Sequence, residues 1–518
     1  TAGLSFAHAL VRDAVYGELA PSRRMALHGQ AARALERTHP GAAAGLIANH
    51  WRRSGAPDWP AHCMRWARDA ACSATASLAY DEAAGFSELA LHAAEEGAVD
   101  TGLRAELTLE AARAEFVAGR IEATLRHCQA AARLAEDAGR ADVLAAAALV
   151  ITGIGDLDTI MAVDLLCAKA LRAAAEDDTA LRARLLARQS IFATETGRGN
   201  RARELSADAL ALAERSDDPD ALLDGIHARH LALSAPQFLA ERRVLGRRAC
   251  EVALLARQPL AELWGHVWLV DAAFQAGDLA AVDHELGAIE RFAVHRRHAV
   301  AWWHLHRLRA TRAALVGELD AALAHNEAAR EVAQGIDTVS MSGMYYAFLG
   351  QLAILRGTVD RDTAEATIAI MRPAAELPLV RIFIPQTYAL LGELDLARAV
   401  FEEFRHVPGT IEVGLRWAPL LNQIGVVATA LGDTETCERV YRELSGLEPS
   451  YGGDGSGAVF SAGSTQRMVG DLALATGRVS EAISNLVKDE KIKGIKDVRD
   501  ESSERKGDPV KIVIELKQ

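Results

Sequence analysis

Histidine is one of two residue types in this chain whose spacing suggests chemistry. The segment HRRHAVAWWHLHRLRA contains His295, His298, His304 and His306. Histidines three residues apart share one face of a helix, and imidazole is a common zinc ligand. No set of cysteines or carboxylates accompanies this segment in the sequence. We therefore interpret these histidines, and also His227 and His230, as half-exposed helical residues, and we expect no metal.

Tryptophan is the second such residue type. Trp264 and Trp268 are one helical turn apart, and Trp302 and Trp303 lie in the corresponding helix of the next repeat. Trp264 and His304 each stand 13 residues before a glycine that ends a helix. We name Trp264, Trp268, Trp303 and His304 as candidate partner-binding residues, an aromatic platform for a peptide or small ligand. Ordinary packing between repeats is the commoner use of such residues and is the alternative.

Residues that could catalyse a reaction are not grouped in the sequence. The acidic pairs Glu402–Glu403 and Asp177–Asp178 are adjacent, so their side chains point to different faces of a helix. No nucleophile-elbow motif surrounds a serine or a cysteine. The six cysteines are scattered and form no CxxC pair, which argues against a zinc ribbon or a redox dithiol. We expect no catalytic residue and no cofactor.

Composition favours a folded, helical and acidic protein. Half of the 518 residues are hydrophobic and a quarter are charged, which argues against disorder. The net charge is -13 and the Arg-Arg pairs of the chain are isolated from one another. The sequence therefore lacks the basic cluster expected of a nucleic-acid-binding protein. No apolar run is long enough for a membrane helix, and unpaired thiols fit a reducing cytoplasm. The chain begins at Thr1 rather than Met, and we expect it to be a fragment of a longer protein.

Glycines recur about every 40 residues, each after an apolar, alanine-rich stretch. They are Gly119, Gly155, Gly197, Gly277, Gly317, Gly357, Gly392, Gly432 and Gly477. The 80-residue gap before Gly277 holds two periods, with one turn near Ala235–Pro236 that carries no glycine. A glycine suits the C-terminal cap of one helix, and a polar residue suits the start of the next. Two helices of roughly 16 residues with two short turns fill 40 positions.

Alanines on both sides of these glycines let paired helices approach closely. The pattern resembles tetratricopeptide-type repeats in a longer, degenerate form. A stack of repeats also escapes the size limit of roughly 250–300 residues for a single core. We therefore predict an all-α fold, a tetratricopeptide-like α-solenoid of helical hairpins that spans residues 41–480.

The opening segment carries three short motifs in order. Residues 4–36 contain F-x-H-x-L-V-R-x-A-V-Y, R-R-x-x-L-H and A-x-A-L-E. Together with the following IANHWRRSG and AYDEAAGFSELALHAAEE, they resemble the end of the ATPase region and the first repeats of large LuxR-type bacterial regulators. Those proteins carry an NTPase, a tetratricopeptide-like array and a terminal helix-turn-helix. The resemblance implies that residues 1–40 are a remnant of the ATPase-associated helical module.

Two functional parts of that family have no match in this sequence. The phosphate-cradling motif G-x-x-x-x-G-K-[ST] is missing, since the chain contains no Gly-Lys dipeptide. The DNA-binding helices that should follow the last repeat are missing too. We therefore expect this chain to bind a partner but neither to hydrolyse ATP nor to read DNA.

Composition changes abruptly near residue 481. Residues 1–487 contain one lysine, Lys169, whereas residues 488–518 contain seven, and no alanine follows Ala482. The run KIKGIKDVRDES, followed by VKIVIELK, resembles the A subunit of bacterial DNA gyrase and topoisomerase IV, just beyond its DNA-cleaving winged helix. The active-site tyrosine region of that family has no match here, so no topoisomerase residue is carried over. For residues 481–518 we expect one helix and one strand that has no partner.

These patterns predict the ligand- or protein-binding scaffold of a bacterial, signal-responsive transcription regulator. We expect it in the cytoplasm, with an unknown protein or small-molecule inducer as its partner and no contact with membrane or nucleic acid. One alternative is a protein related to the type II topoisomerase A subunit through residues 481–518. Another is the sensor array of an ATPase-linked nucleotide cyclase, because some of those enzymes share the opening arrangement.

The change at residue 481 leads to a first prediction, that two coding sources join between about Val479 and Ile483. Such a junction explains why lysine appears and alanine disappears within a few residues. Sequencing genomic DNA across this region in independent isolates is the measurement. A continuous reading frame in several isolates would contradict the prediction.

Overall fold

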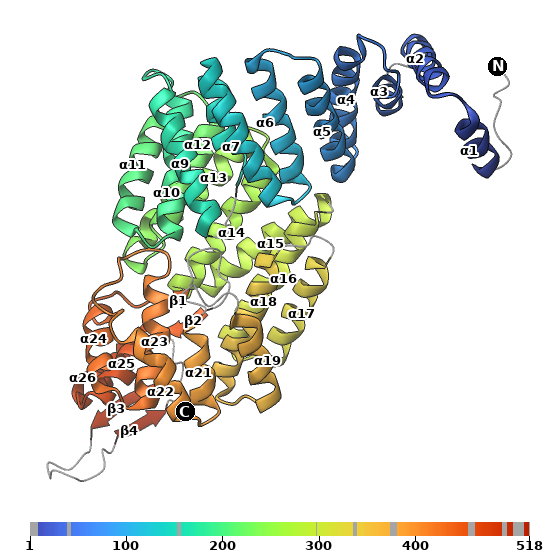
Figure 1. Cartoon of the computed structure of the whole chain (residues 1–518). Helices are drawn as coiled ribbons and strands as arrows, with labels where there is room; N and C mark the ends of the chain where they lie inside the picture. The colour runs from blue at the N-terminus through green and yellow to red at the C-terminus, as the bar shows by residue number, and fades with distance from the viewer. Residues whose placement is uncertain are drawn as a thin grey trace. The chain divides into compact units, whose positions relative to one another are not determined.

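The computed structural model describes residues 9–38, 43–152, 157–296, 298–334, 339–372, 381–453, 461–488, 495–500 and 512–516. These residues are almost entirely helical, and successive helices pair as antiparallel hairpins (Figure 1). The fold is an all-α solenoid, as the 40-residue period predicts. The chain forms two compact units, Thr1–Gln189 (unit 1) and Ser190–Gln518 (unit 2). The division of the chain into residues 1–40, 41–480 and 481–518 stays a prediction.

Unit 1 contains the first helices of the chain. They are α1 (Ala9–Glu18), α2 (Pro21–Thr38), α3 (Ala44–Arg52), α4 (Trp59–Ala76), α5 (Tyr80–Glu96), α6 (Thr101–Val117), α7 (Ile121–Ala138), α8 (Ala141–Ala148) and α9 (Leu157–Ala173). Helix α10 (Thr179–Glu195) begins in unit 1 and ends in unit 2.

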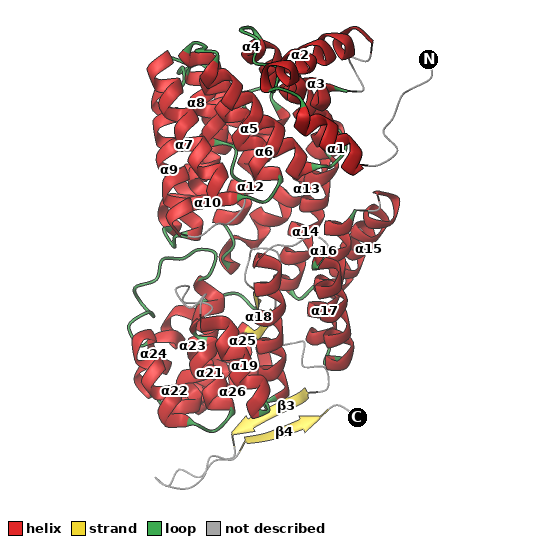
Figure 2. Ribbon diagram, turned by 45° about the vertical axis from the view of Figure 1, so that its right-hand side comes forward, coloured by secondary structure: helices red, strands yellow, loops and turns green. Residues whose placement is uncertain are grey.

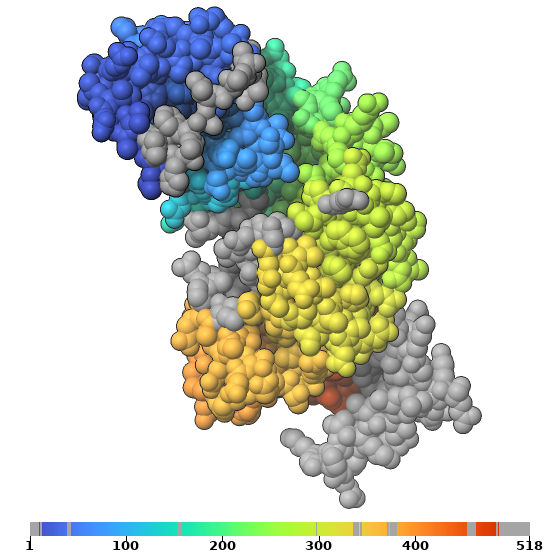
Figure 3. Space-filling view, turned by 90° about the vertical axis from the view of Figure 1, so that its right-hand side faces the viewer, coloured from blue at the N-terminus to red at the C-terminus, as the bar shows by residue number. Residues whose placement is uncertain are grey.

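Unit 2 continues with further hairpins, and Figure 2 shows its helices and short strands by colour. Its first half contains α11 (Gly199–Ala213), α12 (Pro219–Ala232), the 3-10 helix η1 (Pro236–Phe238), α13 (Leu239–Leu255), α14 (Pro259–Ala276), α15 (Leu279–Arg296), α16 (Ala299–Leu315), α17 (Leu319–Ala333) and α18 (Val339–Arg356). Its second half contains α19 (Arg361–Met371), α21 (Phe383–Leu390), α22 (Leu394–Phe401), η3 (Glu402–Phe404), α23 (Trp417–Leu431), α24 (Thr434–Leu444), β1 (Tyr451–Gly453), β2 (Ser461–Ser464), α25 (Thr465–Ala475), α26 (Val479–Lys488), β3 (Ile495–Asp500) and β4 (Ile512–Leu516). The hairpins from α14 to α19 stack side by side, and Figure 3 shows their packed surface in green to yellow.

The turn glycines adopt the conformation that the pattern predicts. Gly277 has φ of 63°, a left-handed conformation that glycine reaches without steric cost. The N–H of Asp278 donates to the carbonyl of Ala273 at 2.9 Å, which closes the helix end. The Asp278 carboxylate then accepts the N–H of Ala281 at 3.1 Å and so caps α15.

The same positive φ recurs at the other predicted glycines that the structure describes. They are Gly119, Gly197, Gly317, Gly357, Gly392, Gly432 and Gly477. Gly155 lies outside the described residues. The predicted break near Ala235–Pro236 is the turn between α12 and α13, which contains η1. The 40-residue period is therefore confirmed through the interval that lacks a glycine.

A carboxylate in unit 1 joins three helices of the opening segment. Glu36 ends the A-x-A-L-E motif and lies on α2. Its Oε1 accepts the indole N–H of Trp51 on α3 at 2.8 Å and that of Trp66 on α4 at 2.5 Å. His62 stacks on Trp51 with ring centroids 4.1 Å apart. The motif residues Glu36 and Trp51, with His62 and Trp66, hold α2, α3 and α4 together.

A buried ion pair joins α13 to α14 in unit 2. Arg242 has no exposed area, and its guanidinium donates to the carboxylate of Asp271, which is 2% exposed. Arg242 also donates to Gln275 Oε1 at 2.8 Å, and Gln275 Nε2 donates to the Ser234 carbonyl at 3.0 Å. Buried charge is tolerated only where it is paired and hydrogen-bonded, so this group fixes the register of the two helices.

The C-terminal strands differ from the expectation. Strand β4 was expected to have no partner, but it pairs antiparallel with β3, with Val498 opposite Ile514. The partner was missed because IKDVRD is highly charged and shows little of the apolar alternation that marks a strand. Much of the gyrase-like sequence, residues 489–494 and 501–511, lies outside the described residues.

Replacing Asp271 by alanine should lower the free energy of unfolding by about 3–5 kcal/mol, because the Arg242 guanidinium stays buried without its carboxylate. Urea denaturation followed by far-ultraviolet circular dichroism measures the loss. Arg201→Ala is the control, since the Arg201 and Glu204 side chains are 58% and 67% exposed. It should cost less than about 1 kcal/mol. Equal losses in the two variants would contradict the prediction.

Candidate functional site

Three residues at the same position of successive repeats define the candidate site. Trp264 on α14, His304 on α16 and Met344 on α18 each stand 13 residues before a turn glycine. The indole of Trp264 meets the His304 ring edge to face, with centroids 4.8 Å apart at 76°. Trp303 meets the other side of the same imidazole at 4.7 Å and 65°. Trp303 and Met344 in turn belong to one hydrophobic cluster with Met341.

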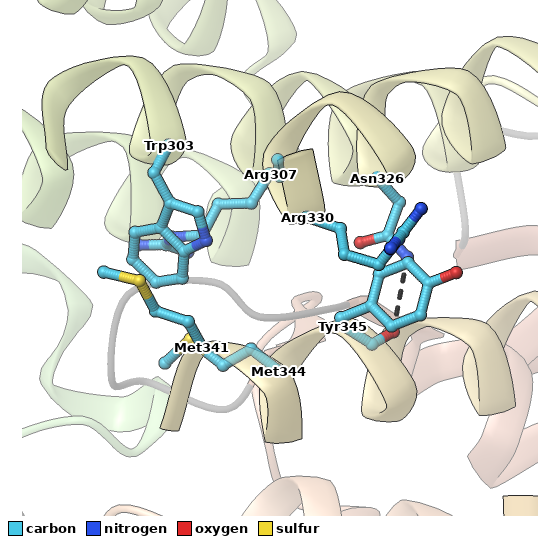
Figure 4. Close-up of a pocket in the computed structure, with 8 residues that line it drawn as sticks. Trp303, Arg307, Asn326, Arg330, Met341, Met344 and Tyr345 are labelled. Carbon is cyan, nitrogen blue, oxygen red and sulfur yellow. Dashed lines mark hydrogen bonds between the residues drawn. The ribbon is translucent and has the colours of Figure 1, made fainter. Parts of the chain in front are cut away.

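A small pocket lies between α16, α17 and α18 and continues this row (Figure 4). It is lined by Trp303, Arg307, Asn326, Ala329, Arg330, Met341, Met344 and Tyr345. Its free volume of about 10 Å³ holds no more than one water molecule. In Figure 4 the indole and the methionines form one half of the pocket, while Asn326, Arg330 and Tyr345 form the other.

Beside the apolar half of the pocket, in contact with Trp303, a histidine is held neutral. Burial lowers the pKa of His304 well below 6.5, and the nearby Arg307 lowers it further. Arg307 Nε donates to His304 Nδ1 at 3.1 Å, so the neutral ring keeps its proton on Nε2. Among the described residues, Nε2 is buried with no hydrogen-bond partner. The Arg307 guanidinium lies 5.0 Å from the centroid of the Trp303 ring, a cation–π contact.

The polar half is a hydrogen-bonded group on α17 and α18. The Tyr345 hydroxyl donates to Glu327 Oε1, and Arg330 Nε donates to Glu327 Oε2 at 2.8 Å. Asn326 Nδ2 donates to the Tyr345 carbonyl at 3.3 Å. Burial, and then the bond to Glu327, raise the pKa of Tyr345 to about 12, while the bonds from Tyr345 and Arg330 lower the pKa of Glu327. Near neutral pH the phenol is therefore protonated and the carboxylate is charged.

This arrangement suits recognition better than catalysis. A general base or nucleophile works best when its pKa lies near the operating pH. The His304 pKa lies below that range and the Tyr345 pKa above it. Indole, thioether and guanidinium groups are the ones that anchor partners at binding surfaces.

The structure brings three of the four candidate residues together. Trp264, Trp303 and His304 are in contact, whereas Trp268 stacks on His227 at 5.0 Å and on His230 at 5.1 Å. Their exposed fractions differ widely. They are 40% for Trp264, 9% for Trp268, 6% for Trp303 and 1% for His304. Trp264 alone of the four therefore offers a large accessible surface.

The expectation that the histidines are half exposed is wrong for His304 and His230. Both are buried, at 1% and 2% exposure, because each packs against an indole. His306 is half-buried and stacks on Trp302 at 5.9 Å, and His295 is exposed. In the described part of the chain, no group of three or more histidine, cysteine, aspartate or glutamate side chains could hold a metal ion.

Sequence reasoning missed the methionines and the exposed leucines of this region. Leu260 lies one turn before Trp264 on α14 and is 51% exposed. Leu254 and Leu255 end the preceding helix, with 66% and 85% exposed. The spacing of 40 residues from His304 to Met344 was the signal that could have added Met344 to the site.

Comparisons with known proteins give no family for the chain. No protein-family model matches it, and no curated protein matches it. Among solved structures, yeast Tom70 is similar over 90% of this chain and 92% of that chain, with 11% identity and a TM-score of 0.30. The Cut9–Hcn1 hetero-tetramer of APC/C is similar over 82% and 86%, with 13% identity and a TM-score of 0.26. Scores this low leave the fold to be argued from the chain's own helices and turns. Within the residues that the structure describes, no helix is both long enough and apolar enough to cross a bilayer.

The buried neutral His304 predicts a loss of stability in acid. Its pKa is lower in the folded chain than in the unfolded one, so its contribution is complete above about pH 6.5 and is lost as pH falls below that value. Each unit of pKa depression corresponds to about 1.4 kcal/mol. Between about pH 7.5 and 5, His304→Gln should therefore lose less unfolding free energy than the unsubstituted chain.

Urea denaturation at the two pH values measures this difference. His295→Gln is the matched control, because His295 is exposed on α15, and it should lose as much as the unsubstituted chain. If His304→Gln also loses as much, the assigned protonation state of His304 is wrong.

Proposed function

We propose that this chain is the ligand- or protein-binding scaffold of a bacterial, signal-responsive transcription regulator of the LuxR type. The order of motifs in residues 4–36 supports the family, and the helical repeats support a scaffold role. The proposal includes a cytoplasmic location, a protein or small-molecule inducer as the partner, and no catalytic activity of the chain itself.

One observation carries the binding role, the exposed apolar surface around Trp264. Leu254 and Leu255 end α13, and Leu260 and Trp264 lie one turn apart near the start of α14. The two helices form one hairpin, joined by only Ala256–Gln258. Large apolar side chains gathered at one place on a surface mark a contact site, whereas scattered ones need no explanation.

The neighbouring repeat supports this surface from within, since Trp303 and His304 are buried. Trp264 contacts His304, and the row continues through Trp303 to the methionines of α18. Leu260 and Trp264, which are exposed one turn apart on α14, fit the apolar face of an amphipathic helix, which places its anchors at that spacing. We propose such a helix as the protein partner.

Binding can act on the rest of a regulator only if the array has two conformations with different affinities for the partner. In the solenoid each hairpin contacts its neighbours, so a small change at one interface alters the curvature of the stack. Trp264 and His304 lie across one such interface, between α14 and α16. A partner seated there can favour one curvature.

A second candidate function rests on residues 481–518, whose sequence resembles the type II topoisomerase A subunit. A third is the sensor array of an ATPase-linked nucleotide cyclase, which shares the opening motifs. We favour the regulator scaffold because the topoisomerase resemblance covers only about 38 residues and carries no catalytic residue of that family.

Trp264→Ala should weaken partner binding at least about ten-fold, which corresponds to about 1.4 kcal/mol. A thermal-shift screen of amphipathic peptides and metabolites supplies the ligand, and calorimetry measures its affinity. The free energy of unfolding should fall by only about 0.5–1.5 kcal/mol, because Trp264 is 40% exposed and loses mainly its ring contact with His304.

Trp268→Ala is the control, since that indole is buried and stacks on His227 and His230. It should cost about 3–5 kcal/mol of stability. If Trp264→Ala binds the ligand as tightly as the unsubstituted chain does, the surface around Trp264 is not the binding site.

The topoisomerase alternative has its own assay. We expect no relaxation of supercoiled DNA and no cleaved DNA–protein complex, because residues 481–518 contain no tyrosine to attack a phosphodiester. Relaxation at enzyme-to-DNA ratios at which gyrase subunits act would favour the alternative.

A further inference from the structure

A segment late in unit 2 returns to the first helices of that unit. We call His406–Arg416 the strap; it follows η3 and leads into α23. The strap contacts the end of α10 and the start of α11, more than 200 positions earlier in the chain. Both contact partners belong to unit 2.

The first contact caps a helix. The N–H of Asn200, in the first turn of α11, donates to Glu412 Oε2 at 2.8 Å. The residue that precedes α11, Arg198, provides no side-chain cap of its own. A carboxylate is the group that the exposed N–H groups and positive dipole of a helix N-terminus favour. Glu412, which is distant in the sequence, therefore caps the N-terminus of α11, a role that an Asp or Ser next to the helix usually has.

Two arginines add further contacts, one donating from α11 to the strap and the other from the strap to α10. Arg203 on α11 donates from Nη1 to the Val413 carbonyl at 2.6 Å. Arg416 of the strap donates to the Glu195 carbonyl at 3.0 Å and to the Glu195 carboxylate at 2.5 Å. The Glu195 side chain is only 3% exposed, so removing Arg416 would leave a buried carboxylate without its ion-pair partner.

Gly199 makes the close approach possible. A Cβ added at Gly199 would lie 2.1 Å from the Val413 carbonyl oxygen, far inside contact distance. The backbone of Gly199 is helical and has no positive φ, so α11 itself does not require glycine there. The strap is what excludes a side chain at this position.

The two ends of the strap are held by different forces. Val407 and Ile411 pack on the hydrophobic cluster that contains Phe404, Trp417 and Leu421, so the strap stays attached to its own repeats. Its contacts to α10 and α11 are charged or main-chain contacts. Glu412 and Asn200 are both exposed, whereas the Arg416–Glu195 pair is largely buried. Exposed charge contacts are weakened by salt and by competing groups, whereas apolar packing is not.

We propose that the strap is a reversible latch. It closes unit 2 by docking on the α10–α11 turn, and it opens while the helices on both sides stay folded. The open state uncovers the first turn of α11 and frees α10, the helix that continues from unit 1. The latch does not depend on the identity of the partner at Trp264.

Gly199→Ala tests the latch without removing any group that makes a contact. Hydrogen exchange followed by mass spectrometry reports on peptides that cover residues 198–204 and 406–416. Exchange in both peptides should rise at least about ten-fold, while peptides of α14 to α18 keep their protection. Gly85→Ala is the matched control, because Gly85 is an exposed helical glycine of α5 with open space around it, and it should change neither peptide.

A second variant tests the charge. Glu412→Gln keeps an acceptor oxygen but removes the negative charge from the α11 N-terminus. In the unsubstituted chain, exchange of the strap should rise between about 0.05 and 1 M NaCl, and Glu412→Gln should show a smaller rise from a higher starting value. Unchanged strap exchange in both variants would overturn the latch. A rise that spreads through α14 to α18 would overturn it too, since the strap would then be part of the folded core.

Discussion

The close approach of helix backbones is the constraint on which both units depend. Alanine is the most frequent buried hydrophobic residue in the described part of the chain, and Ala48, Ala272 and Ala322 have no exposed area. At the crossing of α13 and α14 even alanine is too large, because a Cβ on Gly265 would lie 2.5 Å from Cys250 Sγ. Short side chains bury little apolar area each, so the stack gains its stability from many small interfaces rather than from one large core.

This constraint explains why polar groups are found inside the array. Helices that approach so closely bring opposite residues within hydrogen-bond reach, as for Arg242 and Asp271, or for Gln386 and Gln423, whose amides are 2.5 Å apart. A buried polar group left without a partner is costly, so each such pair admits only one register of its two helices. Alanine alone would allow several registers, since its faces are nearly alike. The polar pairs allow only one of these helix registers.

Local features of the fold could be predicted from the sequence. A glycine such as Gly317, an apolar stretch before it and a polar residue after it fix a turn from neighbouring residues alone. The shared offset of Trp264 and His304 also placed their helices in equivalent positions, and the two rings are in contact. Burial could not be predicted in the same way. His304 and Trp264 share an offset but differ in exposure, because exposure depends on what the next repeat places opposite them.

Contacts between distant parts of the chain could not be predicted from the sequence. Nothing near Glu412 indicates that it caps α11, because the pairing is set by how the whole of unit 2 curves back on itself. Strand β3 was hidden for a related reason, since its charged sequence forms a strand only beside β4. Long-range pairing of this kind has a cost in loop-closure entropy, and no local sequence pattern indicates which distant segments pair.

The strap also has a consequence for the order in which the protein is made. A ribosome adds residues from the N-terminus, so Asn200 leaves the exit tunnel 212 positions before the carboxylate that caps its helix. At roughly 5–20 residues per second, that interval is on the order of 10–40 s. Throughout it, the start of α11 has the N-terminal N–H groups of a helix but no protein acceptor from the strap. The nascent chain therefore presents an anion-seeking helix end to any anion or chaperone that it meets, well before unit 2 can close over it.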